Sequence, residues 1–513
     1  MRREKKFLAL LAWTAVGLWS VLGALPLPSH AAPSGEQVIR SRTDDDLITL
    51  DPAHVGKPSD HMHAMNIYSG LVRLKAGSTG VEPDLATRWE VSPDGRAYTF
   101  YLRRGAKWHK GYGEVTAKDV KYTLDRIRDP ATKSRFRGLL QPLQKIEVVD
   151  DHTIRLTLKD PYPSFLGAVL AFRPGWIVNE RAIKEKGAKY GQDPIGSGPF
   201  MFEKWVRGSE VVLVRNPNTW EKVHIQRVVN KVIRNDTVAK LAIERGDLDV
   251  ATLLEGASIQ EVKKNQKLNI LATPGYATHF LHFNLRKKPF DDVRVRRAIL
   301  HATDREAIAK HVFFGNATPR HNLMNPHVFG YEELYNKADY DPAKARKLLA
   351  EAGFAGGLDA DVNVMPAAQW PQVAAVLQEQ WRQVGIRAKI SVPERAIYDR
   401  KWRAGQFDIL FTRITRVDPD QYIHQYFFSK NQPFPNTSGY AGADGLLLKG
   451  RHTVDEAKRK ELIQAAARKI FVEDLAGFAI VNVNYVVAMQ PYVKNNAPTF
   501  QDSFPWRQVW LEK

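Results

Sequence analysis

Residues 89–126 read WEVSPDGRAYTFYLRRGAKWHKGYGEVTAKDVKYTLDR, and they predict two strands and a helix in succession. The Asp94-Gly95 pair indicates a tight turn, because glycine adopts positive φ without a steric penalty. Apolar and polar side chains alternate over residues 98–102, as expected of a strand with one buried face. Thr116 then provides an N-cap, since apolar side chains follow it at helical spacing. A mixed α/β architecture follows.

The same local signals recur along the chain. Period-two alternation predicts further strands at residues 47–50 and 154–158. A capping-box pattern predicts a helix that begins after Thr303, and an Asp-Pro pair at residues 341–342 predicts another, which Gly353 ends. The sequence has no internal repeat and no long low-complexity linker, so we expect the lobes to be joined by crossings of the chain.

The chain has 513 residues, of which 44% are hydrophobic and 26% charged. This length exceeds what one hydrophobic core usually organises, so two or three packed lobes are expected. The sequence contains no Cys. Structural disulfides, thiol nucleophiles, thiolate metal sites and the lipid-accepting Cys of a bacterial lipoprotein are therefore excluded.

The N-terminus has the pattern of an export signal. Four basic residues precede an almost purely apolar run over residues 7–25, and Ser29-His30-Ala31 offers a cleavage site of the small-x-small kind. We expect residues 1–31 to be a cleaved signal peptide; an uncleaved anchor is the alternative, which the glycines and the proline of the run disfavour. Without a Cys to lipidate, the exported chain fits the periplasm of a two-membrane cell.

The formal net charge is +19, and removal of residues 1–31, which carry a net +3, leaves +16. Attraction of anionic solutes, nucleic-acid binding and surface solubility are three competing explanations. Lys and Arg are spread along the whole chain rather than gathered in a stripe with interleaved aromatic side chains, which a nucleic-acid groove requires. Solubility is the favoured explanation, and no nucleic-acid partner is expected.

The sequence offers no catalytic motif. It has no Gly-x-Ser-x-Gly elbow, Walker loop or His-Glu-x-x-His helix, so we expect no enzyme; carboxylates that converge in space, as in a glycosidase, are the alternative. His61 and Met65 stand four residues apart and would share a helix face, but two metal ligands do not complete a site. The favoured interpretation has no metal and no cofactor, with the histidines in the surface or cleft and the methionines in the core.

Several segments resemble one family, the bacterial extracellular solute-binding proteins of family 5, which includes the dipeptide-, oligopeptide- and nickel-binding proteins of ABC importers. Each segment alone is modest, but they occur in the same order and spread from about residue 51 to past residue 481. They are VEPDLA at 81–86, residues 89–111, TAKDVKYTLDR at 116–126, PIGSGPFMFEKWVRGSEVVLVRNPNTW at 194–220, GDLDV at 246–250, FNLRKKPFDDVRVRRAILHATD at 283–304 and DPAKARKLLAEAGF at 341–354.

The resemblance implies an α/β protein with the two-lobed periplasmic binding protein fold of type II, built on mixed sheets, with a small domain inserted in the first lobe. Closure of the lobes about a hinge encloses the ligand. The implied partners are a small-molecule or short-peptide ligand and ABC permease subunits with a cytoplasmic ATPase in trans, and the binding protein itself is expected to be a monomer. The implied division is 1–31 signal peptide, 32–75 first part of lobe I, 76–193 inserted small domain, 194–284 continuation of lobe I, 285–480 lobe II and 481–513 return to lobe I.

In the similar proteins two regions line the cleft, and the resemblance transfers them to residues 51–63 and 412–425 here. Trp370 occupies a segment that in relatives contributes an aromatic side chain to the pocket; ordinary packing before the following helix is the alternative. The implied ligand-binding residues are Lys57, Ser59 and His61 from the first region, Arg413, Arg416, Asp418 and Tyr422 from the second, and Trp370.

One loop departs from the family pattern. Peptide-binding members carry an acidic residue a few positions before an Asp-Pro-like turn, where it pairs with the peptide α-amino group, whereas residues 413–417 here read RITRV. An Arg that faces the cleft favours a carboxylate or phosphate on the ligand, and Asp418 or Asp420 is the alternative amine anchor. The expected function is capture of a peptide or peptide-like solute for an ABC importer; an anionic non-peptide conjugate, a metal chelate and a periplasmic hydrolase are the alternatives.

Overall fold

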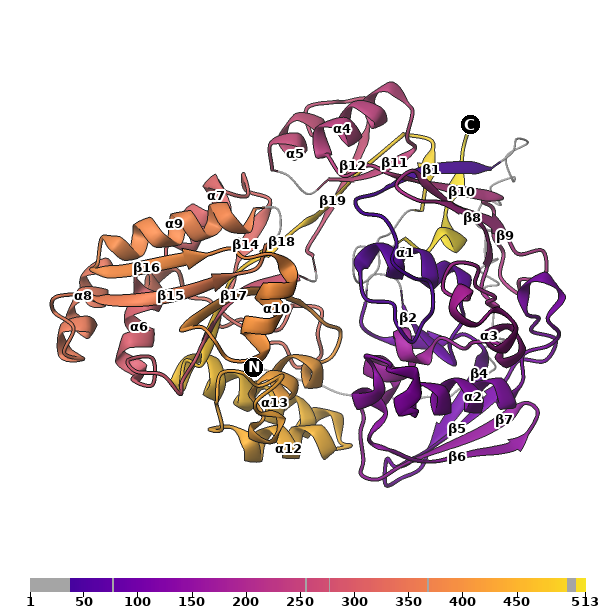
Figure 1. The fold of residues 1–513 in the computed structure, drawn as a ribbon, viewed down its shortest axis with the longest axis horizontal. Coiled ribbons are helices and arrows are strands. Elements are labelled where there is room, and N and C mark those ends of the chain that lie inside the picture. Colours follow the sequence, from indigo (N-terminus) through magenta and orange to yellow (C-terminus); the bar gives the residue numbers. More distant parts are fainter. Residues whose placement is uncertain (1–36, 76–77, 254–255, 276, 367–368, 496–503) are drawn as a thin grey trace, which may run out of the picture.

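The computed structural model describes residues 37–75, 78–253, 256–275, 277–366, 369–495 and 504–513, so the expected signal peptide lies outside the described residues. Within these ranges the chain forms two bodies (Figure 1). We call the body with the seven- and four-stranded sheets lobe I and the body with the six-stranded sheet lobe II. No helix of the described ranges combines the length and the apolar character needed to cross a membrane.

The seven-stranded sheet of lobe I is mixed. Its first strand in the chain pairs in parallel with both neighbours, and the other neighbouring strands pair antiparallel. Helices α4 (Asp236–Arg245) and α5 (Gly256–Val262) pack against one end through a small separate core. The strand order is β12 (Asn269–Thr273), β19 (Tyr485–Met489), β11 (Val250–Leu253), β1 (Val38–Thr43), β10 (Arg227–Val232), β9 (Glu210–Arg215) and β8 (Phe200–Val206).

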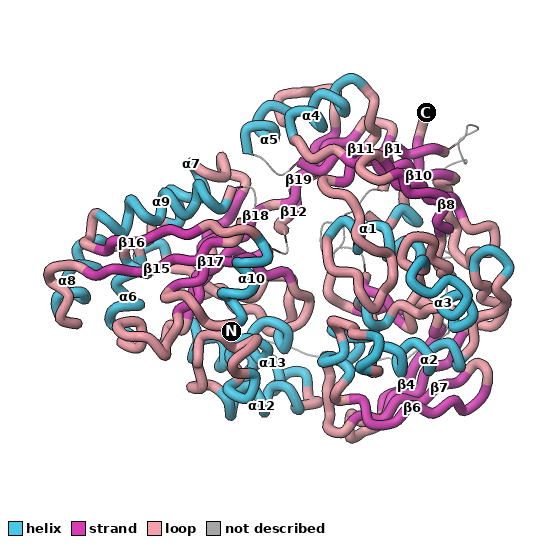
Figure 2. Tube along the Cα trace, viewed as in Figure 1, coloured by secondary structure: helices cyan, strands magenta, loops and turns pink. Residues whose placement is uncertain are grey.

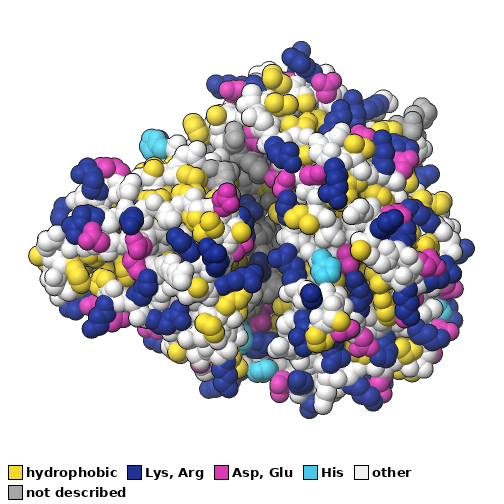
Figure 3. All heavy atoms as spheres, in the orientation of Figure 1, with side chains coloured by type: hydrophobic (Ala, Val, Ile, Leu, Met, Phe, Trp, Pro, Cys, Tyr) yellow, Lys and Arg dark blue, Asp and Glu magenta, His cyan; other side chains and the backbone are white. Residues whose placement is uncertain are grey.

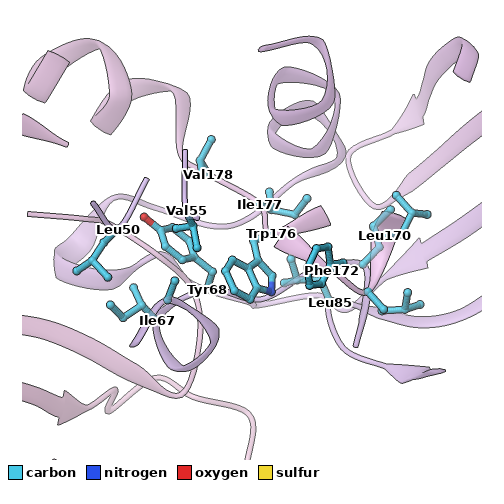
Figure 4. Packing of buried hydrophobic residues seen from close by; sticks show 14 of the residues in the cluster. Leu50, Val55, Ile67, Tyr68, Leu85, Leu170, Phe172, Trp176, Ile177 and Val178 are labelled. Carbon is cyan, nitrogen blue, oxygen red and sulfur yellow. The ribbon is translucent and has the colours of Figure 1, made fainter. Parts of the chain in front are cut away.

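The four-stranded sheet is antiparallel and shares its core with the rest of lobe I. Its buried side chains join one continuous cluster with those of α1 (Pro58–Ile67), and Figure 4 shows Tyr68 and Trp176 within this cluster, where their rings stack at 6.4 Å. The smaller elements of this body are short strand pairs and two helices. The elements are β4 (Ala86–Val91), β5 (Ala97–Leu102), β7 (Thr153–Leu158) and β6 (Leu143–Asp150) in sheet order, with β2 (Val72–Leu74), β3 (Val81–Pro83), β20 (Val493–Lys494), β21 (Trp510–Leu511), α2 (Ala117–Arg128) and α3 (Glu180–Lys186).

The six-stranded sheet of lobe II is also mixed, and helices surround it (Figure 2). Two apolar clusters fill the space between its strands and helices. The sheet order is β14 (Ala317–Pro319), β18 (Gly477–Val483), β13 (Ala277–Phe283), β17 (Ile409–Thr415), β15 (Leu358–Val364) and β16 (Ile386–Ser391), and the helices are α6 (Val293–His301), α7 (Arg305–His311), α8 (Pro342–Glu351), α9 (Trp370–Arg382), α10 (Arg395–Arg403), α11 (Gln425–Phe427), α12 (Asp444–His452) and α13 (Glu456–Arg468).

The chain passes between the lobes at two places, each of which lies between a strand of one sheet and a strand of the other. It crosses between β12 and β13, and it returns between β18 and β19. Because β13 belongs to the sheet of lobe II and begins at Ala277, the first crossing lies before Ala277. The predicted division had put this boundary after residue 284. The two crossings touch, because a Cβ on Gly275 would lie 2.1 Å from the carbonyl oxygen of Val483. The rest of the domain division stays a prediction.

Most of the local predictions are confirmed. Strands span residues 97–102 and 153–158, the turn between β4 and β5 holds Gly95 at φ +68°, and Thr116 forms a capping box with Asp119. The helix predicted from the Asp-Pro pair at residues 341–342 is confirmed as well, since the carboxylate of Asp341 caps α8.

Two local predictions are wrong. Residues 47–50 form no strand, because their backbone N–H groups are bonded elsewhere: Ile48 donates to the Asp60 carboxylate at 2.8 Å and Leu50 to the carbonyl of Gly191. The N-cap of α7 is Asp304, not Thr303. The Thr303 hydroxyl instead donates to the carbonyl of Ile299 at 2.7 Å, back along the preceding helix.

Candidate functional site

A groove runs between the two lobes, and Lys and Arg side chains gather along its edges (Figure 3). We call it the interlobe groove. On the lobe I side, contacts to lobe II come from residues 161–168. On the lobe II side, they come from residues 416–424, which follow β17, and from α12 and α13.

His61 and Arg173 form a buried pair in lobe I. Arg173 Nε donates to His61 Nδ1 at 3.1 Å. Burial first, and then the charge of Arg173, lower the pKa of His61 well below its ordinary value, so the imidazole is neutral and accepts this hydrogen bond. The rings of Phe172 and Trp176 lie 5.9 and 5.0 Å from that of His61. The result is an aromatic wall with one positive charge in it.

Two further arginines act on this charge from different parts of the chain. Burial is the largest cause that lowers the pKa of Arg173, to about 9, and the charges of Arg416 and Arg135 follow in that order. Arg416 belongs to lobe II and the other two to lobe I, so charges from both lobes act on Arg173. We call Arg135, Arg173 and Arg416 the arginine cluster.

Arg416 is held in place by two tyrosines. Its backbone N–H donates to the hydroxyl of Tyr422 at 3.0 Å, and that hydroxyl donates to the Arg416 carbonyl at 3.1 Å. The guanidinium donates to the hydroxyl of Tyr426 at 2.8 Å and to the neighbouring Thr415 carbonyl. These partners are all neutral oxygens. Tyr422 is fully buried, so it positions Arg416 rather than facing the groove.

Asp418 lies in a set of hydrogen bonds that connects the lobes. Ser164 Oγ donates to Asp418 at 2.6 Å, Arg459 Nη2 donates to Ser164 Oγ at 2.6 Å, and Tyr162 donates to Asp420 at 2.8 Å. Gln421 adds a bond to the carbonyl of Ala168 at 3.0 Å. We call these contacts the interlobe bridge.

The bridge leaves Asp418 little capacity for another partner. Burial raises the pKa of this carboxyl, and the charge of Arg459 together with the Ser164 hydroxyl acts in the opposite direction. Its oxygen also accepts the backbone N–H of Asp420 at 2.9 Å. Three groups of the protein thus satisfy a carboxylate that the sequence offered as an anchor for a peptide amine.

The other predicted ligand-binding residues are scattered. Lys57 forms an ion pair with Asp45 at 2.5 Å, and buried Ser59 bonds only weakly through its hydroxyl, which lies 3.4 Å from the carbonyl of Asp46. Arg413 is exposed on β17, opposite His279 on β13. Of the predicted set, His61 accepts a hydrogen bond from Arg173 and the charge of Arg416 acts on that arginine, whereas Lys57, Ser59 and Arg413 lie next to other groups.

Trp370 packs inside lobe II. Its ring stacks on that of His279 at 4.3 Å and lies 5.1 Å from that of Phe411, and only 3% of the residue is exposed. This arrangement matches the packing alternative, in which the Trp ring belongs to the core below α9.

A cavity of about 60 Å³ continues from His61 into lobe I. Both aromatic rings and charged side chains line it. These charges are already paired, since Glu221 lies 2.9 Å from Arg73 and 3.2 Å from Arg507. The cavity adds apolar surface and room beside the arginine cluster.

Arg173 was not among the predicted site residues, but its sequence context could have indicated that it is functional. Residues 164–179 read SFLGAVLAFRPGWIVN, in which Arg173 is the single charged residue of an apolar run. A charge in such a run is costly unless it has a purpose or a partner. The sequence around Arg135 and Arg459 gives no comparable indication, because arginines in polar surroundings are common along this chain.

The metal hypothesis gains no support from the site. His61 faces Arg173, and His63 Nδ1 lies 2.7 Å from the carbonyl oxygen of Ser59. In the described ranges there is no group of three or more His, Cys, Asp or Glu side chains that could hold a metal ion.

Comparison with known proteins places the chain among binding proteins. Residues 80–434 match the family described as bacterial extracellular solute-binding proteins, family 5 (middle region). The dipeptide-binding protein of Escherichia coli (strain K12) is 31% identical over 448 residues, which cover 81% of this chain and 83% of that protein.

Solved structures agree. The binding protein MoaA from A. tumefaciens R10, in complex with mannopinic acid, has a TM-score of 0.80 at 28% identity and covers 93% of this chain and 100% of its own. The periplasmic binding protein DppA from Helicobacter pylori, in complex with the peptide STSA, has a TM-score of 0.80 at 27% identity, with coverages of 93% and 98%. The predicted fold, a two-lobed periplasmic binding protein of mixed sheets, is confirmed.

Proposed function

Because the chain belongs to the bacterial extracellular solute-binding proteins of family 5, we propose that it captures a peptide or peptide-like solute between its lobes and delivers it to an ABC importer. Two of the relatives are a dipeptide-binding protein and a di/tripeptide-binding protein, and one of the similar structures holds a peptide. The observation that carries the proposal is the interlobe groove, into which charged side chains converge from both lobes next to an aromatic wall.

Closure of the groove distinguishes the loaded protein from the empty one. A ligand shifts the balance between open and closed forms only by the difference in its affinity for the two. Arg416 from lobe II and Arg173 from lobe I supply that difference, because a solute between them contacts both only when the lobes approach. The membrane permease, which works with a cytoplasmic ATPase, then recognises the closed form.

The location and the chemistry are part of the same proposal. We infer that residues 1–31 direct export and are removed, which places the mature monomer in the periplasm. The protein makes and breaks no bonds of the solute, so a peptide eluted from it after long incubation is chemically unchanged. His61, Arg416 and the neighbouring lobe I side chains form the solute site.

The test uses the purified chain, freed of co-purified solute by partial unfolding and refolding. A digest of casein into short peptides is expected to raise the midpoint of thermal unfolding and to reduce the radius of gyration in solution. At a ligand concentration 100 times Kd, mass action adds about 2.7 kcal/mol of stability. A mixture of free amino acids is the matched control. Unchanged melting and an unchanged radius with the peptide digest would contradict the proposal.

A further inference from the structure

We propose that the cavity of about 60 Å³ between His61 and Arg507 binds a neutral side chain of the solute that ends in a carboxamide, as glutamine does. We call this space the side-chain cavity. The inference rests on the proposed function and specifies which solutes the groove prefers. It starts from two buried polar atoms of the cavity wall that the protein leaves without a hydrogen bond.

Asp84 and Arg507 line the side-chain cavity, and each uses only part of its hydrogen-bonding capacity. Asp84 Oδ2 accepts the backbone N–H of Gly70 at 2.9 Å, whereas Oδ1 is buried and has no hydrogen-bond partner in the described part of the chain. Arg507 donates to Glu221 through Nη1 and to the carbonyl of Met65 through Nη2, each at 3.2 Å. Its Nε is buried and has no partner among the described residues. The cavity wall therefore offers one acceptor and one donor.

Burial makes these two atoms costly to leave unbonded. Asp84 is only 2% exposed and Arg507 only 8%, so bulk water reaches neither group freely. The nearest cation does not compensate, because Arg73 Nη1 lies 3.6 Å from Asp84 Oδ1, beyond the length of a hydrogen bond. Buried polar groups in native proteins are almost always paired, so such atoms point to a partner that the chain itself does not supply.

The opposite end of the side-chain cavity is aromatic and lies toward lobe II. Phe172 and Trp176 line it together with His61, and Figure 4 shows the first two rings as neighbours. These residues follow shortly after Ala168, whose carbonyl accepts from Gln421 of lobe II at 3.0 Å. A side chain that enters from the interlobe groove therefore passes aromatic rings before it reaches the polar end.

A carboxamide on an aliphatic stem fits this order of surfaces. Its NH₂ group donates to Asp84 Oδ1, its carbonyl accepts from Arg507 Nε, and its methylene groups pack against the aromatic rings. A single water needs roughly 10–15 Å³, so a cavity of about 60 Å³ has room for a group of several non-hydrogen atoms.

Other side chains satisfy the polar end less well. A carboxylate would lie beside the carboxylate of Asp84, and an ammonium group would lie beside the guanidinium of Arg507; like charges in a buried space repel. An apolar side chain fills the space but leaves both polar atoms unbonded. The side-chain cavity therefore discriminates by charge and by hydrogen bonding.

The experiment titrates the solute-free chain by calorimetry with tripeptides that carry one variable residue in an alanine background, placed in turn at each position. Glutamine is compared with glutamate and methionine, which have a similar length and differ in charge and in hydrogen bonding. At one position the glutamine peptide is expected to bind roughly tenfold more tightly than either of the others, or better, because only it bonds both atoms without repulsion.

Asp84→Asn tests the role of the acceptor. The Asn oxygen keeps the bond to the backbone N–H of Gly70, so the NH₂ group replaces the unbonded oxygen and the cavity offers two donors. The glutamate peptide should then bind more tightly than the glutamine peptide, which reverses the preference. Asp249→Asn is the matched control, because Asp249 is also buried in lobe I but bonds to Arg40 and Tyr492 outside the cavity. It should leave the preference unchanged.

Arg507→Lys tests the role of the donor. This substitution keeps the positive charge next to Glu221 and removes Nε. The preference for glutamine over methionine is expected to disappear, while the affinity for the methionine peptide remains. A ratio of affinities is the readout for both variants, so a general loss of binding through misfolding is told apart by far-ultraviolet circular dichroism and thermal unfolding.

The outcomes separate the two proposals. If the glutamine peptides bind no more tightly than the methionine peptides at any position, or if Asp84→Asn and Arg507→Lys both fold and leave the preference unchanged, the cavity holds water only and solute capture stands. The same conclusion follows if no tripeptide binds although the casein digest compacts the chain. If no tripeptide binds and the digest causes no compaction either, the proposed function fails along with the inference.

Discussion

Single residues show how strongly burial controls the chemistry of this protein. Several histidines are held neutral inside the lobes, and burial is the first cause in each case. It lowers the pKa of His279 and of His282 to about 3, and the pKa of His63 and of His109 to about 4. An unfolded chain exposes these rings, whose ordinary pKa is about 6.5.

Stability should therefore fall in mild acid. Between the folded pKa values near 3 to 4 and the unfolded value near 6.5, the unfolded state binds more protons than the folded state. Stability from these groups is fully present above about pH 6.5 and is lost as the pH falls toward 4. Each histidine contributes a slope of up to about 1.4 kcal/mol per pH unit in this window. Urea unfolding at pH 7 and pH 5 measures the difference.

His279→Phe provides a specific check of that mechanism. The ring of His279 stacks on Trp370 and lies edge-on to Phe313 at 5.6 Å, and its Nδ1 has no hydrogen-bond partner in the described ranges. Phenylalanine keeps the aromatic packing and removes the titrating group. The variant should lose less stability between pH 7 and pH 5 than the original chain. If both proteins lose the same stability over this range, groups other than His279 cause the acid sensitivity.

Gly275 illustrates close backbone approach at the crossing between lobes. An added Cβ would lie 2.1 Å from the Val483 carbonyl, an atom of the other crossing, so the two crossings would have to separate. Gly275→Ala is expected to destabilise the chain by about 1–3 kcal/mol, as overpacking does. Gly445→Ala in α12 is the control, because nothing lies within 4 Å of its Cβ. Equal midpoints of urea unfolding for the two variants would show that the crossings tolerate the methyl group.

Helix ends decide local stability at the scale of elements. The Asp304 carboxylate accepts the backbone N–H of Ala307 at 2.9 Å and caps α7, although the sequence pattern favoured Thr303. The Thr303 hydroxyl is buried and accepts from Trp381 Nε1 at 3.0 Å. Local sequence rules select Thr303 as the cap, but its side chain is engaged in a tertiary contact with Trp381. The next polar residue, Asp304, caps the helix instead.

Substitution at Asp304 tests which residue caps α7. Asp304→Ala should cost about 1 kcal/mol of stability through the loss of a capping bond, whereas Asp304→Asn keeps an oxygen acceptor and should cost less. Urea unfolding curves measure both. Equal losses for Ala and Asn would mean that the carboxylate acts by its charge or by other contacts rather than as a cap.

The interlobe bridge belongs to the scale of the whole molecule. Its hydrogen bonds join residues that are more than 250 positions apart, and they exist only while residues 161–168 of lobe I touch lobe II. A typical hydrogen bond contributes about 0.5–1.5 kcal/mol net, and one to a charged group about 1.5–3 kcal/mol. The bridge therefore favours the closed arrangement before any solute is considered.

Loss of the bridge should open the solute-free protein. The double variant Tyr162→Phe with Ser164→Ala removes the hydroxyls bonded to Asp420 and Asp418. We expect a larger radius of gyration without solute and weaker binding, because the solute must then supply more of the closing free energy. Tyr112→Phe is the control, since its hydroxyl bonds to exposed Glu185 within lobe I. An unchanged radius would show that the bridge has no part in closure.

Local order in the sequence was sufficient for the fold class and for most elements. The Asp94-Gly95 turn, the alternation in β5 and β7, and the caps of α2 and α8 depend on neighbours within a few residues, and colinear motifs identified the family. Residues 47–50 failed because distant groups, Asp60 and Gly191, bond their backbone.

The site depended on tertiary structure. His61 and Arg416 were named from the sequence, but Arg135 and Arg173 were not, and Trp370 turned inward. Convergence of charges from residues 135, 173 and 416 requires two lobes to face one another, which no spacing along the chain encodes. Electrostatic repulsion and desolvation act through space, and only the folded arrangement lets the charges of Arg135 and Arg416 lower the pKa of Arg173.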